Sequence, residues 1–139
     1  MNGRTRFSWE KTALLLAFDI ARYRSEDPYV QVGAVIIKQD NSIVLGYNGA
    51  PPGIEIDWSN RDERRERVIH AEENALDNIR YGEAKIMAVT AMPCKGCMRK
   101  LAQKGVKKVY YKDELINYDN TLAKKLAAEF GIELIHFSA

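Results

Sequence analysis

The sequence contains little cysteine and has no long apolar run. Its two cysteines, Cys94 and Cys97, stand in one C-x-x-C, which excludes a disulfide framework and leaves metal binding or redox chemistry. No apolar run approaches the roughly 20 residues of a membrane-spanning helix, so we expect no membrane association. The N-terminal arginines are not followed by the apolar segment of a secretory signal, and we therefore expect a cytoplasmic protein.

A strong excess of one charge is also absent. The 139 residues include 21 Lys and Arg against 19 Asp and Glu, a net charge of +2. This balance argues against a nucleic-acid polymer as partner, although a local basic pocket for a phosphate group is compatible with it. The length and the ordinary hydrophobic content of 46% predict one domain, residues 1–139, with its own core.

Hydrophobic periodicity and turn residues predict five strands and the helices between them. We expect a first helix from Ser8, as N-cap, to about Tyr23, then a hairpin, and then a loop over 48–60. The expected strands are 32–37, 42–47, 85–90, 106–112 and 132–137, and the later helices are 71–81, 94–104 and 121–130. Helices between the later strands predict an α/β fold with a largely parallel sheet, covered on both faces, and an antiparallel opening hairpin.

The C-x-x-C stands at the start of a predicted helix, directly after Pro93. Residues at i and i+3 share a helix face, so the sulfurs of Cys94 and Cys97 can reach one metal ion. A helix N-terminus also favours the thiolate form that a metal requires. Thiolates combined with an imidazole select zinc over magnesium or calcium, and we therefore expect Zn2+.

His70 supplies the imidazole, in a His-Ala-Glu sequence that also contains Glu72. In a regular helix, residues i and i+2 point roughly 200° apart, so His70 and Glu72 cannot both serve one site from the middle of a helix. They can do so if the helix begins at about His70. The sequence therefore predicts a break before His70 that separates the charged segment 61–67 from the helix 71–81.

Two thiolates and one imidazole leave the fourth tetrahedral position open, which is typical of a catalytic zinc site. Zinc lowers the pKa of bound water to about 7, and Glu72 can take up the proton of that water. Two alternatives stay open from the residues alone. One is a redox-active cysteine pair, and the other is a structural zinc site with His136 as fourth ligand. His136 belongs to the predicted terminal strand, where an ordinary strand histidine is the more common role.

The combination H-x-E…P-C-x-x-C is the signature of zinc-dependent deaminases of nucleobases. Further motifs make the sequence resemble the deoxycytidylate (dCMP) deaminase family over about residues 21–111. They are Val-Gly-Ala-Val at 32–35, Gly-Tyr-Asn-Gly-Ala-Pro-Pro-Gly at 46–53, His-Ala-Glu-Glu-Asn-Ala at 70–75 and Pro-Cys-Lys-Gly-Cys at 93–97. The resemblance implies a three-layer α/β/α fold with a five-stranded mixed sheet. It also implies hydrolysis of dCMP to dUMP for thymidylate synthesis, with Glu72 moving protons, in a homo-oligomer that is a hexamer.

The resemblance implies contacts for the nucleotide as well. The asparagine matching Asn48 approaches the sugar hydroxyl, and the backbone at Ala71 binds the base. Arg24, in a stretch similar to the family's Arg-Ser-x-Asp-Pro, is expected to bind phosphate because a guanidinium matches phosphate oxygens. The alternative for Arg24 is a solvated arginine at a helix end. Tyr111 ends a predicted strand beside the expected crevice and is a further candidate for a nucleotide contact.

Regulation by nucleotides is also implied by the resemblance, with activation by dCTP and Mg2+ and inhibition by dTTP. Gly49, Gly53 and Arg80 are the candidate effector contacts. The segment 48–53 is expected to be a binding loop, with an ordinary turn as the alternative. The charged segment 61–67 is typical of a solvated helix face, and the alternative is that it closes over a triphosphate.

Met92 and Met98 depart from the family's usual pattern around Pro-Cys, and both can reshape the pocket. Compact members of the family accept dCTP as well as dCMP, so the phosphorylation level of the substrate stays open. One competing function is a related deaminase of tRNA adenosine, guanine or free cytidine; such relatives commonly have Glu where this chain has Met92. Another is a non-catalytic, zinc-stabilised nucleotide-binding module, against which the intact Glu72 argues.

Overall fold

The computed structural model describes residues 3–114 and 120–137. The helices are α1 (Trp9–Arg24), α2 (Arg61–Arg67), α3 (Ala71–Leu76), α4 (Lys95–Gln103) and α5 (Asn120–Glu129). The strands are β1 (Gly33–Lys38), β2 (Ile43–Tyr47), β3 (Ala84–Ala91), β4 (Lys108–Asp113) and β5 (Glu133–His136). All five expected strands are present within a few residues of the predicted bounds. No helix among the described residues is long and apolar enough to cross a membrane.

The five strands form one mixed sheet in the order β2-β1-β3-β4-β5. β1 runs antiparallel to both β2 and β3, whereas the β3–β4 and β4–β5 pairs are parallel. The prediction of a largely parallel sheet was therefore wrong, since half of the strand pairs are antiparallel. The reason is that the chain passes from β2 through α2 and α3 to β3 without pairing these two strands. β3 then runs in the direction of β2, with β1 between them.

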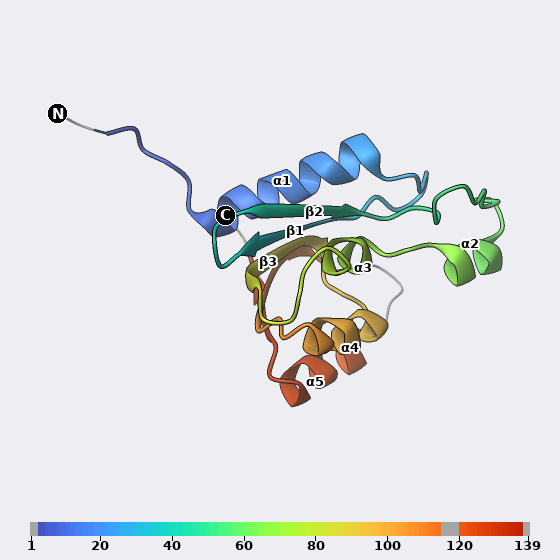
Figure 1. Ribbon diagram of the computed structural model, residues 1–139. Helices are drawn as coiled ribbons and strands as arrows, with labels where there is room; N and C mark the ends of the chain where they lie inside the picture. The colour runs from blue at the N-terminus through green and yellow to red at the C-terminus, as the bar shows by residue number, and fades with distance from the viewer. Residues whose placement is uncertain (1–2, 115–119, 138–139) are drawn as a thin grey trace.

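Helices cover both faces of the sheet, which gives the expected three-layer α/β/α arrangement (Figure 1). On one face, α1 packs Ala13, Leu14 and Ala17 against Val35 and Ile37 of β1. On the other face lie α3, α4 and α5, and the alternate residues of β1 point towards them. Because β1 is buried on both faces, its sequence reads as a continuous apolar run rather than as an alternating pattern.

Two glycines allow helices to lie very close to the sheet. A Cβ atom at Gly33 would collide with the backbone carbonyl of Ala17 in α1, and one at Gly46 would collide with the carbonyl of Ala71 in α3. Only a residue without a side chain fits at either contact. Gly46 matters for the site described below, because it sets the first turn of α3 directly against β2.

The predicted break before His70 is confirmed. Between α2 and α3 the chain is extended, and Ile69 forms an isolated bridge with Gly49 through two backbone hydrogen bonds of 2.8 and 3.1 Å. The predicted extent of the next helix was wrong, since α3 ends at Leu76 and not near Tyr81. Tighter turns follow, in which amide groups bond to carbonyls three residues earlier. Ile79 is nevertheless buried, which confirms the apolar face predicted for this segment although the helix does not reach it.

Candidate metal centre and active site

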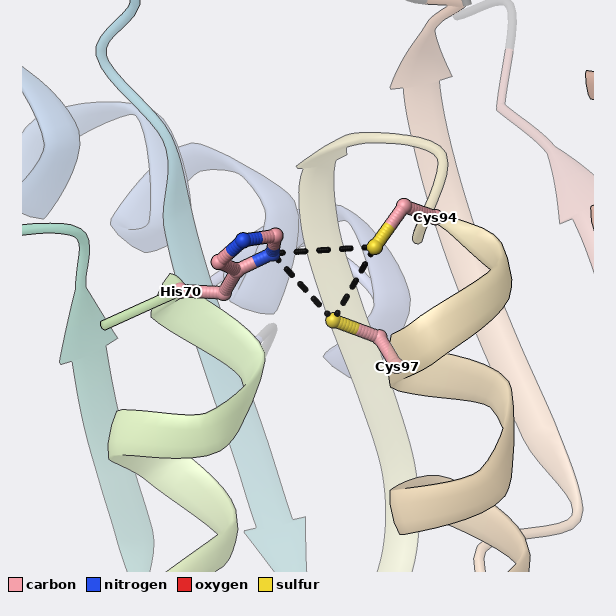
Figure 2. Close-up of side chains that lie close together, drawn as sticks. All are labelled: His70, Cys94 and Cys97. Carbon is pink, nitrogen blue, oxygen red and sulfur yellow. Dashed lines mark hydrogen bonds between the residues drawn. The ribbon is translucent and has the colours of Figure 1, made fainter. Parts of the chain in front are cut away.

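His70 and Cys94 occupy equivalent positions, each being the N-cap of a helix that begins at the end of the sheet. Both backbones are extended, with φ/ψ of −73°/153° at His70 and −74°/170° at Cys94. Each carbonyl accepts a helical hydrogen bond, from Asn74 in α3 and from Met98 in α4. Neither side chain caps its own helix. The imidazole and the thiol are therefore directed towards each other instead, as Figure 2 shows.

Two further contacts fix these helices relative to the sheet and to one another. The side-chain oxygen of Asn74 accepts a 3.1 Å hydrogen bond from the backbone of Tyr47, which ties α3 to β2. An ion pair between Glu73 of α3 and Lys100 of α4 joins the two ligand-bearing helices. The helices that begin at the metal-binding residues are thus fixed to the sheet and to each other.

The three side chains fit a tetrahedral zinc site. Sγ of Cys94 lies 3.6 Å from Sγ of Cys97 and 3.7 Å from Nδ1 of His70, and Sγ of Cys97 lies 3.5 Å from the same nitrogen. Zinc bonds of about 2.3 Å to sulfur and about 2.0–2.1 Å to nitrogen, at tetrahedral angles, require roughly 3.8 Å between sulfurs and roughly 3.6 Å between sulfur and nitrogen. The observed triangle matches these separations. Two thiolates and one imidazole, with no further ligand in this cluster from the described part of the chain, are the donor set of a catalytic zinc site.

Of the three metal-binding side chains, only Cys94 is driven by the other protein groups towards the charge state that a metal needs, since zinc binds thiolates and a neutral imidazole. The contact with Cys97, followed by that with His70, lowers the pKa of Cys94 to about 3. The hydrogen bond with Cys94 raises the pKa of His70 to about 9, against the opposing effect of burial. The pKa of Cys97 is raised, first by its contact with Cys94 and then by burial. Because the pKa values of His70 and Cys97 are raised, binding of a cation such as zinc would displace protons from both side chains.

Glu72 lies in the first turn of α3, two residues after His70, and is only 4% exposed. Burial raises the pKa of its carboxyl group, while the nearby His70 lowers it. A carboxyl group whose pKa is moved towards neutral can both accept and donate a proton near physiological pH. Because the helix begins at Ala71, the side chains of His70 and Glu72 reach the same cavity, as the sequence required.

His70 and Cys94 open onto a cavity of about 400 Å³, and Cys97 lies behind them, buried. This volume lies within the range of small-ligand pockets, about 300–1,000 Å³. The cavity is lined by Asp27, Val30, Val32, Asn48, Arg61, Arg64, Arg65, Val68, His70, Ala71, Glu72, Ala91, Met92 and Cys94. It therefore combines two of the three expected zinc ligands, His70 and Cys94, and Glu72 with apolar walls and with three arginines from α2.

Asn48 both lines the cavity and holds one of its walls together. Its side-chain oxygen accepts hydrogen bonds from the hydroxyl of Ser25 at 2.5 Å and from the backbone of Val32 at 3.0 Å. Its amide nitrogen donates to the carbonyl of Val30 at 2.8 Å. A side-chain amide has two donor hydrogens, and the bond to Val30 uses only one of them. Asn48 is thus a fixed, buried polar group with one donor to offer.

The structure separates the expected nucleotide contacts into two groups. Asn48 and Ala71 line the cavity, whereas Arg24 and Tyr111 do not. Arg24 is exposed at the end of α1, with its guanidinium 5.7 Å from the ring centroid of Tyr47. Tyr111 is buried in β4, where its ring packs 5.4 Å from that of His136. Although Tyr111 stands near the end of β4, its side chain does not line the cavity.

The expected effector residues also lie outside the cavity lining. Gly49 pairs with Ile69, and the segment between α2 and α3 is anchored there. Gly53 has a positive φ of 78°, with open space on the side where a Cβ would stand. Arg80 is exposed beyond α3, and its backbone amide donates to the carboxylate of Glu83 at 2.5 Å.

Sequence reasoning did not single out Asp27, which lines the cavity and is 7% exposed. One carboxylate oxygen of Asp27 accepts from the backbone amides of Tyr29 and Val30, at 2.8 and 3.1 Å. An Asp before a proline is a common turn-forming signal, and it was available in Asp-Pro at 27–28. The sequence predicts either a solvated face or a cover for a triphosphate for the arginines of α2, and three of them line the cavity.

The geometry bears on the two alternatives for the cysteines. His136 is not a member of the metal-binding cluster found among residues 3–114 and 120–137. Its Nε2 lies 2.8 Å from the carbonyl of Lys112, which is the environment of an ordinary strand histidine. An imidazole nitrogen nearly equidistant from both sulfurs favours metal binding over a redox-active cysteine pair.

Comparisons with known proteins agree with this site. Residues 7–113 match the family model described as the cytidine and deoxycytidylate deaminase zinc-binding region. A probable deoxycytidylate deaminase of Caenorhabditis elegans is 42% identical over 108 residues, which cover 69% of this chain and 55% of that protein. The deoxycytidylate deaminase of Mus musculus is 35% identical over 130 residues, covering 85% of this chain and 72% of that protein.

A solved structure shows the same fold with nucleotides bound. The dCMP deaminase of cyanophage S-TIM5, in complex with dCMP and dUMP, superposes with a TM-score of 0.68 at 30% identity, and 93% of each chain is covered. The chain thus spans nearly all of the phage enzyme but little more than half of the nematode protein. The His/Cys/Cys cluster, the buried glutamate and the matched region lead to one conclusion: this chain belongs to the zinc-binding cytidine and deoxycytidylate deaminase family.

Proposed function

We propose that this protein hydrolyses dCMP to dUMP and ammonia, a reaction that supplies thymidylate synthesis. The observation that carries the proposal is a cavity of about 400 Å³ that Glu72 lines together with His70 and Cys94, two members of the His/Cys/Cys triangle. Relatives named deoxycytidylate deaminase and the phage structure with dCMP and dUMP support the choice of nucleotide.

In this mechanism His70, Cys94 and Cys97 would hold Zn2+. When bound, zinc lowers the pKa of a water molecule to about 7 and so makes hydroxide accessible near neutral pH. Glu72 would accept a proton from the attacking water and deliver it to N3 of cytosine as the water oxygen adds to C4. Glu72 then carries the second proton to the 4-amino group, the C4–N bond breaks, and ammonia leaves. The raised pKa of Glu72 suits a group that must first accept and then donate.

Asn48 and Ala71 are the proposed substrate contacts. The remaining amide hydrogen of Asn48 is available to the sugar hydroxyl, and the backbone of Ala71 faces the cavity beside Glu72. Arg24 and Tyr111 lie outside the cavity lining, so the proposal gives neither of them a direct contact. Met92 and Ala91 supply apolar wall on the side of α4.

We extend the proposal to assembly and regulation on the strength of the family resemblance. The extended proposal gives the protein as a homo-hexamer. Its activator is dCTP with Mg2+, its inhibitor is dTTP, and the effector contacts are Gly49, Gly53 and Arg80. Exposed apolar side chains on the edge strand β2, Ile43 and Leu45, support association with further copies. Both cysteines belong to the metal site, so neither is available for a disulfide bond of the kind found in secreted proteins. This supports a cytoplasmic location.

The test is direct. Zinc-loaded protein is mixed with dCMP, dCTP, CMP and deoxycytidine, and the loss of cytosine absorbance is followed. We expect turnover of dCMP above that of CMP and deoxycytidine. Failure to turn over any of the four, with zinc bound, would contradict the proposal.

A further inference from the structure

We propose that the ion pair between Glu73 and Lys100 is a positioning contact for the metal site, which helps the protein to retain zinc by holding α3 and α4 at the separation that the metal needs. The inference concerns metal retention and goes beyond the proposed function, because it does not depend on which nucleotide is hydrolysed. Glu73 and Lys100 neither belong to the metal-binding cluster nor line the cavity.

Each member of the ion pair stands three residues after a metal-binding residue. Glu73 follows His70 at the start of α3, and Lys100 follows Cys97 in α4. Residues three apart lie on the same side of a helix, roughly one turn further along. The ion pair therefore connects α3 and α4 one turn beyond the metal-binding cluster, where His70 and the two cysteines already bring the same helices together (Figure 2).

α3 depends on outside contacts for its position, because a helix of six residues is not stable on its own. The strand β2 holds one side of it. The turns after α3 are held to the end of α4 by Lys104, whose ammonium group donates a 2.6 Å hydrogen bond to the carbonyl of Ile79. The pair of Glu73 and Lys100 supplies a polar contact to α4 at the other end of α3, which begins at the metal site.

A zinc site benefits from such a contact because its ligands come from two separate helices. Two thiolates at one site repel each other, and this repulsion favours separation of the ligands. A contact that keeps the helices in the metal-bound arrangement reduces the ordering that binding must bring about, and so raises affinity. The side chains of Glu73 and Lys100 are 26% and 49% exposed, so the expected contribution is that of a partly solvated pair.

Direct action of the two charges on the metal would give a different result. Glu73 and Lys100 have opposite charges, so their separate removal would shift zinc affinity in opposite directions if each acted through its own field. The contact between them is lost in either case, and both changes should then weaken zinc binding. The signs of the two effects therefore distinguish a positioning contact from independent charges.

The experiment measures zinc affinity by competition between the zinc-loaded protein and a chromogenic chelator. Glu73→Gln, Lys100→Gln and the double variant form a double-mutant cycle at nearly constant side-chain size. Lys100→Arg retains a positive charge opposite Glu73. The matched control is the same cycle at Lys38 and Glu83, a partly exposed ion pair of 3.1 Å that joins the end of β1 to the turn before β3. The free energy of unfolding is measured for every variant by urea titration.

We expect Glu73→Gln and Lys100→Gln each to weaken zinc binding by about 1.5- to 5-fold, as for the loss of a partly exposed ion pair. The double variant should match the single variants, because the first substitution already removes the contact. Lys100→Arg should bind zinc as the unaltered protein does. The control cycle at Lys38 and Glu83 should lower the free energy of unfolding and leave zinc affinity unchanged.

Unchanged zinc affinity or opposite shifts in the two single variants would overturn the inference, as would a double variant whose free-energy loss is the sum of both. An equal loss of zinc affinity in the control cycle would do the same, because general destabilisation would then explain it. If Glu73→Gln fails to fold, Lys100→Gln and Lys100→Arg decide the question, and weaker binding in both would contradict a role for the pair. These measurements need no substrate, so absence of dCMP turnover would contradict the proposed function alone.

Discussion

Nδ1 of His70 and Sγ of Cys94 lie 3.7 Å apart, although the two residues begin different helices and are separated by a whole strand of the sheet. Both are N-caps whose side chains do not cap. An N-cap side chain normally accepts a hydrogen bond from its own helix, and leaving it free costs stability of about 1 kcal/mol. At these two positions that capping interaction is given up for metal binding.

Substitution of a metal ligand should abolish zinc binding. We expect Cys97→Ser protein to contain far less than one zinc per chain, because a hydroxyl is a poor ligand for zinc beside thiolate and imidazole. Metal content is measured by atomic absorption after dialysis. His136→Ala is the control and should retain zinc, since His136 is bonded to the carbonyl of Lys112. Loss of zinc from the control would instead favour the structural site with His136 as a ligand.

Asn48→Ala should destabilise the protein as well as weaken substrate binding. Three hydrogen bonds to the segment 25–32 are lost, and their partly buried partners Ser25 and Val32 are left without them. We expect a loss of about 2–4 kcal/mol in the free energy of unfolding, measured by urea titration. Asn78→Ala is a suitable control, because the exposed side chain of Asn78 makes one hydrogen bond, to the carbonyl of Asn74. Equal effects of both substitutions would contradict the assigned role of Asn48.

Gly46→Ala should disturb the site through the backbone. Its added methyl group would meet the carbonyl of Ala71, so α3 must move away from β2. Overpacking of this kind costs roughly 1–3 kcal/mol or more, and the shift of α3 carries His70 and Glu72 with it. Thermal unfolding and zinc content are the measurements. Gly3→Ala, which places its methyl group in open space, should leave both unchanged.

Glu83 makes a small, pH-dependent contribution to stability. The amide of Arg80 and then the ammonium of Lys38 lower the pKa of its carboxyl group below the usual 4.5. A lowered pKa in the folded state stabilises the protein above the unfolded value, and the benefit disappears as pH falls through the folded value. Glu83→Gln should therefore lower Tm at pH 7, and the difference from the unaltered protein should shrink below about pH 4.5. Glu129→Gln, on the exposed side of α5, is the control; a difference that grows at low pH would contradict the assignment.

Much of the site could be predicted because its requirements are local. The spacing of His70 and Glu72 demands a helix start between them, and the structure has that start at Ala71. The C-x-x-C needs only one helical turn to bring its sulfurs together. Both inferences depend on a few consecutive residues, whose geometry the helix repeat dictates.

The directions of the other side chains, the strand pairing and the end of α3 depend on tertiary contacts, which no local sequence pattern contains. Arg24 and Tyr111 have the right chemistry, but the direction of each side chain is set by neighbours from distant segments, Tyr47 and His136. The pairing of β1 with β3 likewise follows from the path of the chain across the sheet. The helix after His70 ends early for a similar reason, since its apolar pattern is satisfied by tight turns that still bury Ile79.

The central claim is that Glu72 moves protons at a zinc site that His70, Cys94 and Cys97 hold. The most direct test is a paired measurement of zinc content and dCMP turnover for the unaltered protein and for Glu72→Gln, which keeps the size of the side chain. We expect one zinc per chain in both proteins and a fall in kcat of at least about 10²-fold in the variant, as is usual on loss of a general acid–base group. Full turnover by the zinc-loaded variant would contradict the claim.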